Sequence, residues 1–278
     1  MPTCKNQDLT PVSSGADMTF AVRAGRTVLA HSRVHAPVAL VRPFPLDDGG
    51  QLVQLITIGP GLCAGDRLQI RISVETGARV VLTTPAATRV LSMDPERHAE
   101  QHVDLRVAVG ATLEYYPAVT IPFPASDFVQ TIRVDADPGA RVGVLETWSM
   151  GRTSRDEYLR FRRLSTRTTI EVEGRTVYAD AMELQPDRDR LDGAGILAGR
   201  RYLAAGVWFG ADLDDARVPG PIDASDLMVA FDQARPGIAY LRALGSDAPA
   251  LDAGLRDACN RIAAAWARPS VCLDRFRC

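Results

Sequence analysis

The sequence predicts a mainly β protein, built as an array of stacked strand units with helices near its C-terminus. Two observations indicate the strands: polar and apolar residues alternate strictly in several runs, and a unit of strand, Gly-Ala turn and strand recurs about every thirty residues. A third indicates the helices, because apolar residues at spacings of three and four become frequent only after residue 226. Three hairpins of an ordinary β-sandwich with similar turns are the alternative to the array.

Alternation is clearest in residues 68–75 and 103–109 and in the run that begins at Ile132. Each run is followed by a turn and a second strand: Gly77-Ala78 before 79–84, Gly110-Ala111 before 112–117, and Gly139-Ala140 before 141–148. The turns therefore recur at a nearly constant spacing. One such unit alone cannot form a core, so we expect each to bury its apolar face against the next. Further strands are expected at 26–30, 52–58, 169–173 and 176–180.

Two helical regions are expected after these strands. Residues 226–244 have helical spacings, but Pro236-Gly237 should divide them into two pieces. Residues 251–267 predict a helix that Asp247 could cap, with Pro249 at an early position and Pro269 as the stop. Residues 185–222 predict loops around one apolar strand, 202–210. We expect residues 1–18 to be a flexible segment, 19–268 to form a single domain, and 269–278 to be a tail.

Composition limits the functional classes. The chain has 278 residues, 46% of them apolar and 24% charged, which is typical of a globular protein. A net charge of −2 argues against nucleic acid as a partner, because affinity for nucleic acid comes largely from clustered cations. The sequence has no apolar segment of membrane-spanning length and no signal-peptide core, and its five cysteines form no C-x-x-C pair. We therefore expect a cytoplasmic protein with no membrane partner.

The glycine-rich segment at residues 59–65 is not a dinucleotide fingerprint, because an alternating strand follows it where a helix is required. It predicts a tight turn that ends at Asp66. Cys63 lies in this turn and could be a metal ligand or a nucleophile, but no neighbouring base can be assigned. A structural role for this small residue is the favoured interpretation. Phosphate-loop, zinc-protease and serine-hydrolase motifs are absent from the sequence.

His98 and His102 are four residues apart and would share one face of a strand or a helix with Glu100 and Asp104. Two imidazoles and two carboxylates would suit Ni, Zn or Cu. The run continues into the alternation of 103–109, however, which places these four side chains opposite the apolar face. The favoured interpretation is a solvated face, and a metal site is the alternative.

The order of the motifs resembles the family of the urease accessory protein UreD, called UreH in some organisms. The resemblance covers residues 21–266 and is strongest over residues 59–161. It rests on four segments: GPGLCAGDRL, LTTPAATRVLSM, GATLEYYPAVTIPFPASDFVQ and ETWSMGRTSRDEYLRF. The chain departs from the family pattern at Pro60, where a glycine is usual, at Pro85, where a glutamine is usual, and at Arg89, where a lysine is usual. Pro85 removes an amide donor next to the Thr-Thr pair.

The resemblance implies a non-enzymatic maturation factor with an elongated, β-helix-like fold and two helices. Members of the family bind apo-urease together with an all-helical (UreF-like) accessory protein and a nickel GTPase (UreG-like), and are thought to pass nickel through an internal conduit. It implies no tightly bound cofactor, only transient Ni(II). Matching the family's motifs residue by residue assigns the path to Asp66, Thr83, Thr84, Glu146, Arg152 and Glu157. Carboxylates bind Ni(II) more weakly than imidazole or thiolate, and could hold the ion without trapping it.

Two other functions remain open at this point. The protein could be a scaffold that only holds its partners together, with nickel never passing through this chain. It could also be a hydrolase or lyase on a β-solenoid, with Glu146 and Glu157 as paired acid and base. The sequence separation of these two carboxylates says nothing about their distance in space, and only 6% of the residues are aromatic, too few to indicate a sugar-stacking ladder.

Overall fold

The computed structural model describes residues 14–215, 222–224 and 226–271. These residues form nineteen β-strands, two short 3-10 helices and one α-helix. The elements are β1 (Gly15–Arg23), β2 (Arg26–His35), β3 (Val38–Leu40), β4 (Phe44–Pro45), β5 (Gln51–Thr57), β6 (Arg67–Val74), β7 (Arg79–Thr83), β8 (Thr88–Val90), β9 (Ala99–Val107), β10 (Thr112–Tyr116), β11 (Thr120–Pro122), β12 (Asp127–Ala136), β13 (Arg141–Ser149), η1 (Thr153–Arg155), β14 (Arg163–Val172), β15 (Arg175–Leu184), β16 (Tyr202–Phe209), η2 (Ala211–Asp215), β17 (Ile222–Asp223), β18 (Leu227–Arg235), β19 (Ile238–Gly245) and α1 (Ala248–Ala265).

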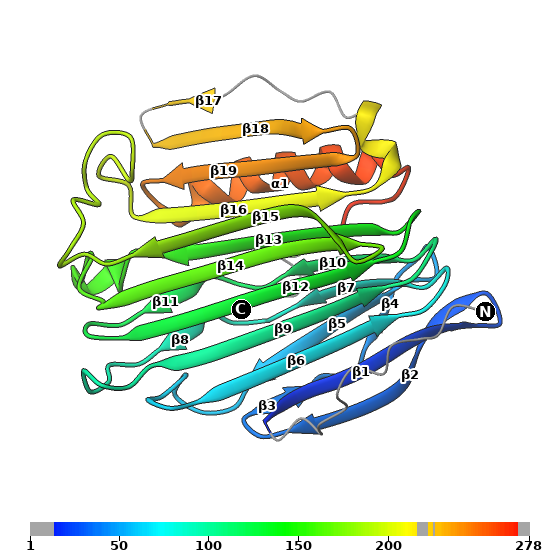
Figure 1. Cartoon of the computed structure of the whole chain (residues 1–278), viewed down its shortest axis with the longest axis horizontal. Coiled ribbons are helices and arrows are strands. Elements are labelled where there is room, and N and C mark those ends of the chain that lie inside the picture. The colour runs from blue at the N-terminus through cyan, green and yellow to red at the C-terminus, as the bar shows by residue number, and fades with distance from the viewer. Residues whose placement is uncertain (1–13, 216–221, 225, 272–278) are drawn as a thin grey trace.

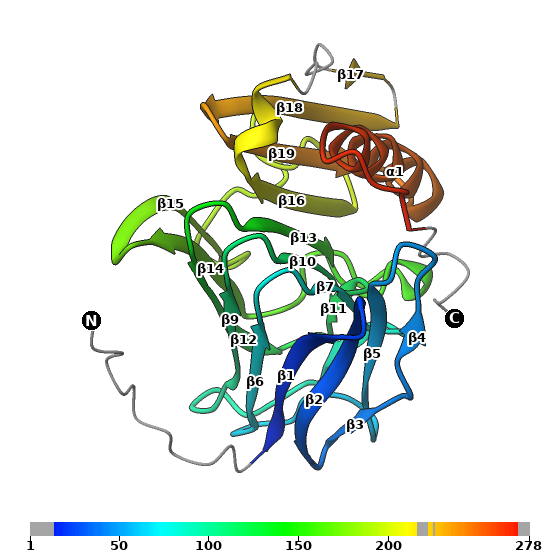
Figure 2. The ribbon, with the colours of Figure 1, turned by 90° about the vertical axis from the view of Figure 1, so that its right-hand side faces the viewer.

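The strands form two sheets that face each other (Figure 1). The first has seven strands in the order β15-β14-β12-β9-β6-β1-β2. The second has twelve, with the main order β17-β18-β19-β16-β13-β10-β7-β5-β3. The chain passes from one sheet to the other at each Gly-Ala turn, and Figure 2 shows the two layers with the turns joining them. The stacked-coil, β-solenoid-like arrangement predicted from the repeat is confirmed.

The hydrogen-bond register repeats the spacing of the glycines. In the first sheet β6, β9, β12 and β14 are parallel neighbours, and in the second β5, β7, β10 and β13 are. Arg79 pairs with Thr112, and Thr112 pairs with Arg141. Each of these three residues stands two positions after the glycine of its own Gly-Ala turn. Equivalent residues of successive coils therefore lie side by side across the sheet.

The space between the sheets is filled mainly by apolar side chains. Near the Gly-Ala turns, β6, β9 and β12 each point apolar residues inward. Ile72, Leu105 and Val134 are among these residues, and all are buried in one core. The predicted alternation holds: β6 and β9 bury every second residue and leave the intervening polar residues at least partly exposed. Burial of this apolar area is the main favourable contribution to folding.

A second, smaller core lies on the opposite face of the twelve-stranded sheet, where α1 packs on β16, β18 and β19 (Figure 2). Leu251, Leu255 and Ile262 of α1 contact this core. The helix expected at 251–267 is confirmed as α1, and the Asp247 side chain caps it by accepting a hydrogen bond from the Ala250 amide. In the part of the chain that the structure describes, no helix is long and apolar enough to cross a bilayer.

The expectation of helical pieces in residues 226–244 is wrong, because this segment forms the hairpin of β18 and β19. The chain turns at Pro236-Gly237, and Gly237 has a φ of +77° that favours glycine. Side chains alternate along β19 with period two: Ala239, Leu241 and Ala243 are buried in the core beneath α1, whereas Ile238 and Leu244 on the other face contact the core between the sheets. One α-helix, not two, is therefore present among the described residues.

Both ends of the described chain contact the rest of the fold. Strand β1 begins at Gly15, inside the segment 1–18 that is expected to be flexible, because Ala16 and Met18 are fully buried in the core. Residues 1–13 and 272–278 lie outside the described residues. At the other end, Pro269 follows α1 and its carbonyl accepts a hydrogen bond from Arg79.

We predict that Gly110→Ala destabilises the protein by about 1 kcal/mol, because Gly110 has a φ of +70° that costs an alanine about that much. An added Cβ would have room, with the nearest atom 4.0 Å away, so sterics contribute little. Urea unfolding measures the change. Gly110→Asn is the matched control and should cost less, since asparagine tolerates this conformation. Equal losses in both variants would contradict the conformational explanation.

Candidate functional site

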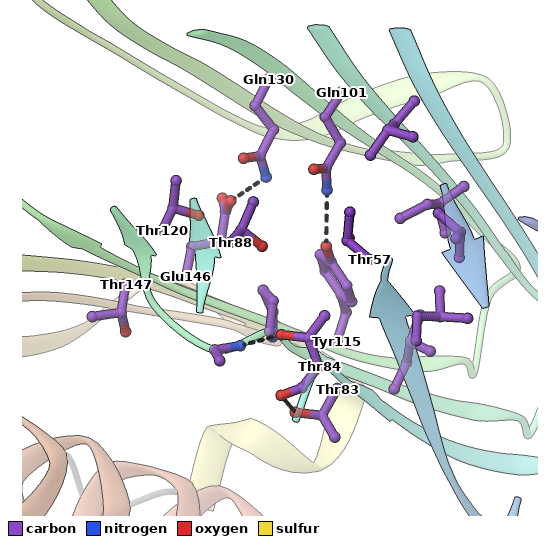
Figure 3. Close-up of a pocket in the computed structure, with 17 residues that line it drawn as sticks. Thr57, Thr83, Thr84, Thr88, Gln101, Tyr115, Thr120, Gln130, Glu146 and Thr147 are labelled. Carbon is purple, nitrogen blue, oxygen red and sulfur yellow. Dashed lines mark hydrogen bonds between the residues drawn. The ribbon is translucent and has the colours of Figure 1, made fainter. Parts of the chain in front are cut away.

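The candidate site is a small cavity between the two sheets, at the end of the coils away from the Gly-Ala turns (Figure 3). Its volume of about 30 Å³ has room for roughly two water molecules. Its polar lining is made of hydroxyl, amide, phenol and carboxyl groups: Thr57, Thr83, Thr84, Thr88, Gln101, Tyr115, Thr120, Gln130, Glu146 and Thr147. Apolar residues of β3, β5 and β6, including Val38, Leu55 and Leu68, complete it.

Two glutamines of the first sheet point into this cavity. Gln101 of β9 and Gln130 of β12 are register partners, so they stand at the same position of successive coils. Both are buried, at 8% and 4% exposure. The Gln101 amide donates a hydrogen bond to the hydroxyl of Tyr115 at 3.4 Å, and the Gln130 amide donates one to the carboxyl of Glu146. Each glutamine therefore bonds across the interior to the opposite sheet, as Figure 3 shows.

Glu146, on β13, is the buried carboxyl group of this interior, with 5% exposure. Its hydrogen bonds come from the neutral amide of Gln130 and from the Thr168 hydroxyl at 3.4 Å. Burial raises the pKa of Glu146 to about 8, and the two hydrogen bonds only partly oppose this shift. Glu146 also lines a second, smaller cavity on its other side, toward β14, β15 and β16. It is therefore common to two interior cavities.

Thr83 and Thr84 lie at the end of β7 and line the main cavity. The Thr83 hydroxyl donates to the Tyr116 carbonyl at 2.7 Å, and the Thr84 hydroxyl accepts from the Ala118 amide at 2.9 Å. These bonds fix the cavity wall between β7 and the segment after β10. Pro85, the departure from the family pattern, comes after the end of β7, so its missing amide falls outside that strand.

Three of the expected path residues lie elsewhere. Asp66 accepts a hydrogen bond from the Cys63 amide at 2.7 Å and so closes the glycine-rich turn. Arg152 and Glu157 form a two-point ion pair in the loop after β13, with Nη2 and Oε1 2.6 Å apart, and the guanidinium stacks on Phe123 at 4.2 Å. The pair lowers the pKa of the Glu157 carboxyl. Asp66, Arg152 and Glu157 line neither of the two cavities described above.

This arrangement does not support the acid and base pair considered for a hydrolase. Glu146 is inside the solenoid and bonded to Gln130, whereas Glu157 is bonded to Arg152 in a loop. Glu157 lines neither of the two cavities that Glu146 lines, so the two carboxyl groups do not face a common space there.

His102 lies on the outer face of β9, as the alternation indicates, and His98 immediately precedes this strand. Both imidazoles contact Glu100, with Nε2 to carboxylate distances of 2.7 and 3.4 Å, and Arg67 also pairs with it at 3.3 Å. Although partial burial opposes it, the pKa of Glu100 is lowered by these partners. Cys63 is exposed in its turn and is not joined to this group. Across the residues that the structure describes, no three His, Cys, Asp or Glu side chains are arranged to hold a metal ion.

A second buried carboxyl group belongs to the other face of the sheet. Glu114 of β10 pairs with the buried Arg79 guanidinium at 3.1 Å and accepts a hydrogen bond from Tyr116. Burial raises the pKa of Glu114, and Arg79 opposes the shift. Trp208 donates to the Tyr116 hydroxyl at 2.8 Å, so this network joins the strands beneath α1 and not the cavity.

Gln101, Gln130 and Thr168 were missed from the sequence, although a signal was present. Gln101 stands at the inward parity of β9, between Ala99 and Val103, in a strand whose other inward residues are apolar. Gln130 stands at the equivalent position of β12, one coil later. A polar residue on the apolar side of the alternation, repeated at the coil spacing, indicates an interior polar site.

Comparison with known proteins gives a consistent result. A family model described as "UreD urease accessory protein" matches residues 13–278. A protein of Deinococcus radiodurans named "Urease accessory protein UreD" is 33% identical over 254 residues, which cover 89% of this chain and 91% of the relative. A protein of a Synechococcus species named "Urease accessory protein UreD 1" is 36% identical over 195 residues, or 70% of this chain and 73% of the relative.

We predict that Glu146→Gln changes the pH dependence of stability. The folded protein keeps the Glu146 proton up to about pH 8, whereas the unfolded chain releases it near 4.5. The folded state binds more protons between these values, so wild-type stability should fall relative to the variant as pH rises through this window, by at most about 1.4 kcal/mol per pH unit. Below the window the difference should be constant.

Urea unfolding at pH 5, 6.5 and 8 in the presence of a chelator measures this difference. Glu171→Gln is the control, because Glu171 is an exposed residue of β14. Parallel stability profiles for wild type and Glu146→Gln would show that the Glu146 carboxyl does not titrate in this window.

Proposed function

The chain belongs to the UreD urease accessory protein family, and from this premise we propose that it is a non-enzymatic factor in urease maturation that passes Ni(II) through its interior toward apo-urease. The observation that carries the proposal is Glu146, a buried carboxyl group shared by two cavities between the sheets. We place its action in the cytoplasm, with apo-urease, an all-helical UreF-like protein and a nickel GTPase as its partners.

The lining of the interior suits a cation in transit. The described groups of the main cavity offer oxygen and amide ligands, with neither imidazole nor thiolate among them. Such ligands hold Ni(II) weakly compared with histidine and cysteine, so an ion bound there can leave again. The cavity has room for roughly two water molecules, and a fully hydrated ion would have to exchange much of its water for the threonine, glutamine and glutamate oxygens.

Glu146 couples the passage of the ion to a proton. At neutral pH its raised pKa keeps most of the carboxyl protonated, so the interior carries little charge when no ion is present. A divalent cation bound at Glu146 would displace this proton, because metal ligands bind in their deprotonated form. The carboxylate itself is then never left unpaired, and the net charge of +1 on the occupied site would be stabilised by the neutral oxygen ligands around it.

We predict that Glu146→Gln lowers nickel-limited urease activation by about tenfold or more, the usual range when a group that supports a bound metal is replaced. Folding and co-purification with apo-urease and the two accessory partners should be unchanged, because glutamine keeps the size and a hydrogen-bonding oxygen. The measurement is urease activity after activation with limiting Ni(II), together with a pull-down. Glu171→Gln should behave as wild type. Normal activation by Glu146→Gln would leave the protein as a scaffold without nickel transit.

Occlusion of the cavity tests the same proposal by another route. Thr88 lines the cavity, whereas its neighbour Arg89 is exposed. We predict that Thr88→Phe still binds the partner proteins but activates less urease. Arg89→Phe should change neither partner binding nor urease activation. Unaffected activation in a correctly folded Thr88→Phe protein would contradict passage through this cavity.

A further inference from the structure

The second cavity lies at the end of the solenoid where the first sheet finishes. It is a space of about 10 Å³ between β13, β14, β15, β16 and β19. Its polar lining is Glu146, Thr168, Tyr178, Asp180 and Arg242. Because Glu146 also lines the main cavity, this smaller space is the next one along the interior from it.

The register of the strands aligns these side chains in two facing rows. In the second sheet Glu146 is opposite Ala205, and Ala205 is opposite Arg242, so the three share one face. In the first sheet Thr168 is opposite Asp180. The rows meet twice: Thr168 donates to Glu146 at 3.4 Å, and Arg242 forms an ion pair with Asp180. Ala205 carries only a methyl group, which leaves space between Glu146 and Arg242.

Of these two contacts, the Arg242–Asp180 ion pair is the outer one and lies at the surface. The side chains of Arg242 and Asp180 are 37% and 27% exposed, whereas Glu146 is 5% exposed. Asp180 is on β15, the edge strand of the seven-stranded sheet, and Arg242 is on β19 of the other sheet. The ion pair therefore bridges the two sheets between solvent and the cavity that contains Glu146.

The chemistry of this end favours a divalent cation. The Arg242 guanidinium is the positive charge in the lining of the second cavity, and it also bonds to Tyr178 and acts on the charge of Glu146. If it turned out to solvent, it would leave two carboxyl groups, a phenol and a hydroxyl, an all-oxygen set that attracts a cation. A surface ion pair is weak, so this exchange of one cation for another is accessible.

On the basis of the proposed function, we propose that a divalent cation passes through this end of the solenoid and that the Arg242–Asp180 ion pair closes it. Arg242 then acts as a tethered cation that occupies the opening until the cargo ion replaces it. Arg242 and Asp180 are therefore gating residues, whereas Glu146 holds the ion inside.

The test measures access from solvent to position 168. Thr168→Cys places a thiol beside Glu146, and its modification by iodoacetamide is followed by peptide mass spectrometry, with the exposed Cys63 as internal reference. We expect Asp180→Asn to raise the rate at the introduced thiol about fivefold, the factor that a surface ion pair is worth, and Arg242→Ala to raise it further. The double variant should add nothing to Arg242→Ala, because both remove one contact.

The matched control is Arg235→Ala. Arg235 of β18 also reaches β15, where it bonds to the Val177 carbonyl, but it does not line the cavity. Its replacement should leave the rate at the introduced thiol unchanged. Equal acceleration by Arg235→Ala would mean that β15 has loosened as a whole, and no acceleration by Arg242→Ala would mean that the ion pair does not close this end. Either result overturns the proposal.

Urease activation separates this proposal from the proposed function. An open end should let nickel escape, so Arg242→Ala, with Thr168 intact, should lower activation severalfold at limiting Ni(II) and recover it at excess Ni(II). If Glu146→Gln lowers activation and Arg242→Ala does not, passage at this end is wrong while the interior path stands. If Glu146→Gln itself activates normally, the interior path fails, whatever the rate of thiol modification at position 168.

Discussion

A carboxyl group is held inside this β-solenoid by an amide and a hydroxyl, without a cation in contact with it. A buried carboxylate without a partner is costly, and the pKa of Glu146 accordingly rises to about 8. An apolar residue at this position would pack without that cost. Glu146 instead lies between two cavities and is surrounded by glutamines and threonines, so the interior around it is polar.

Glu114 makes the contrast clear. It is also buried in the second sheet, but it faces the other way and pairs with Arg79 and Tyr116 beneath α1. Adjacent strands of one sheet thus carry one buried acid that is paired with a fixed cation, Arg79, and another that is bonded only to neutral groups. The first belongs to the packing of the helix layer, and the second to the space between the sheets.

The stacking of the coils is what turns single polar residues into a continuous lining. Because the register advances by the length of each coil, Gln101 and Gln130 become neighbours although they belong to different coils. Beyond the coils, antiparallel pairing of β13, β16 and β19 places Glu146, Ala205 and Arg242 in one row, even though their strands come from distant parts of the chain. Parallel and antiparallel register together therefore align polar side chains from the main cavity to the second one.

The sequence by itself determined the stacked β array, the order of its coils, the late helix and the resemblance to UreD, since alternation and the spacing of Gly77, Gly110 and Gly139 are local properties of the chain. It also brought Thr83, Thr84 and Glu146 forward through the family motifs. Only the tertiary structure decided that 227–245 is a hairpin, that Arg152 and Glu157 pair with each other, and that Gln130, Thr168 and Asp180 face the interior near Glu146. The physical reason is that a side chain's partner across two facing sheets depends on register and on the closing of the coils, neither of which a local pattern contains.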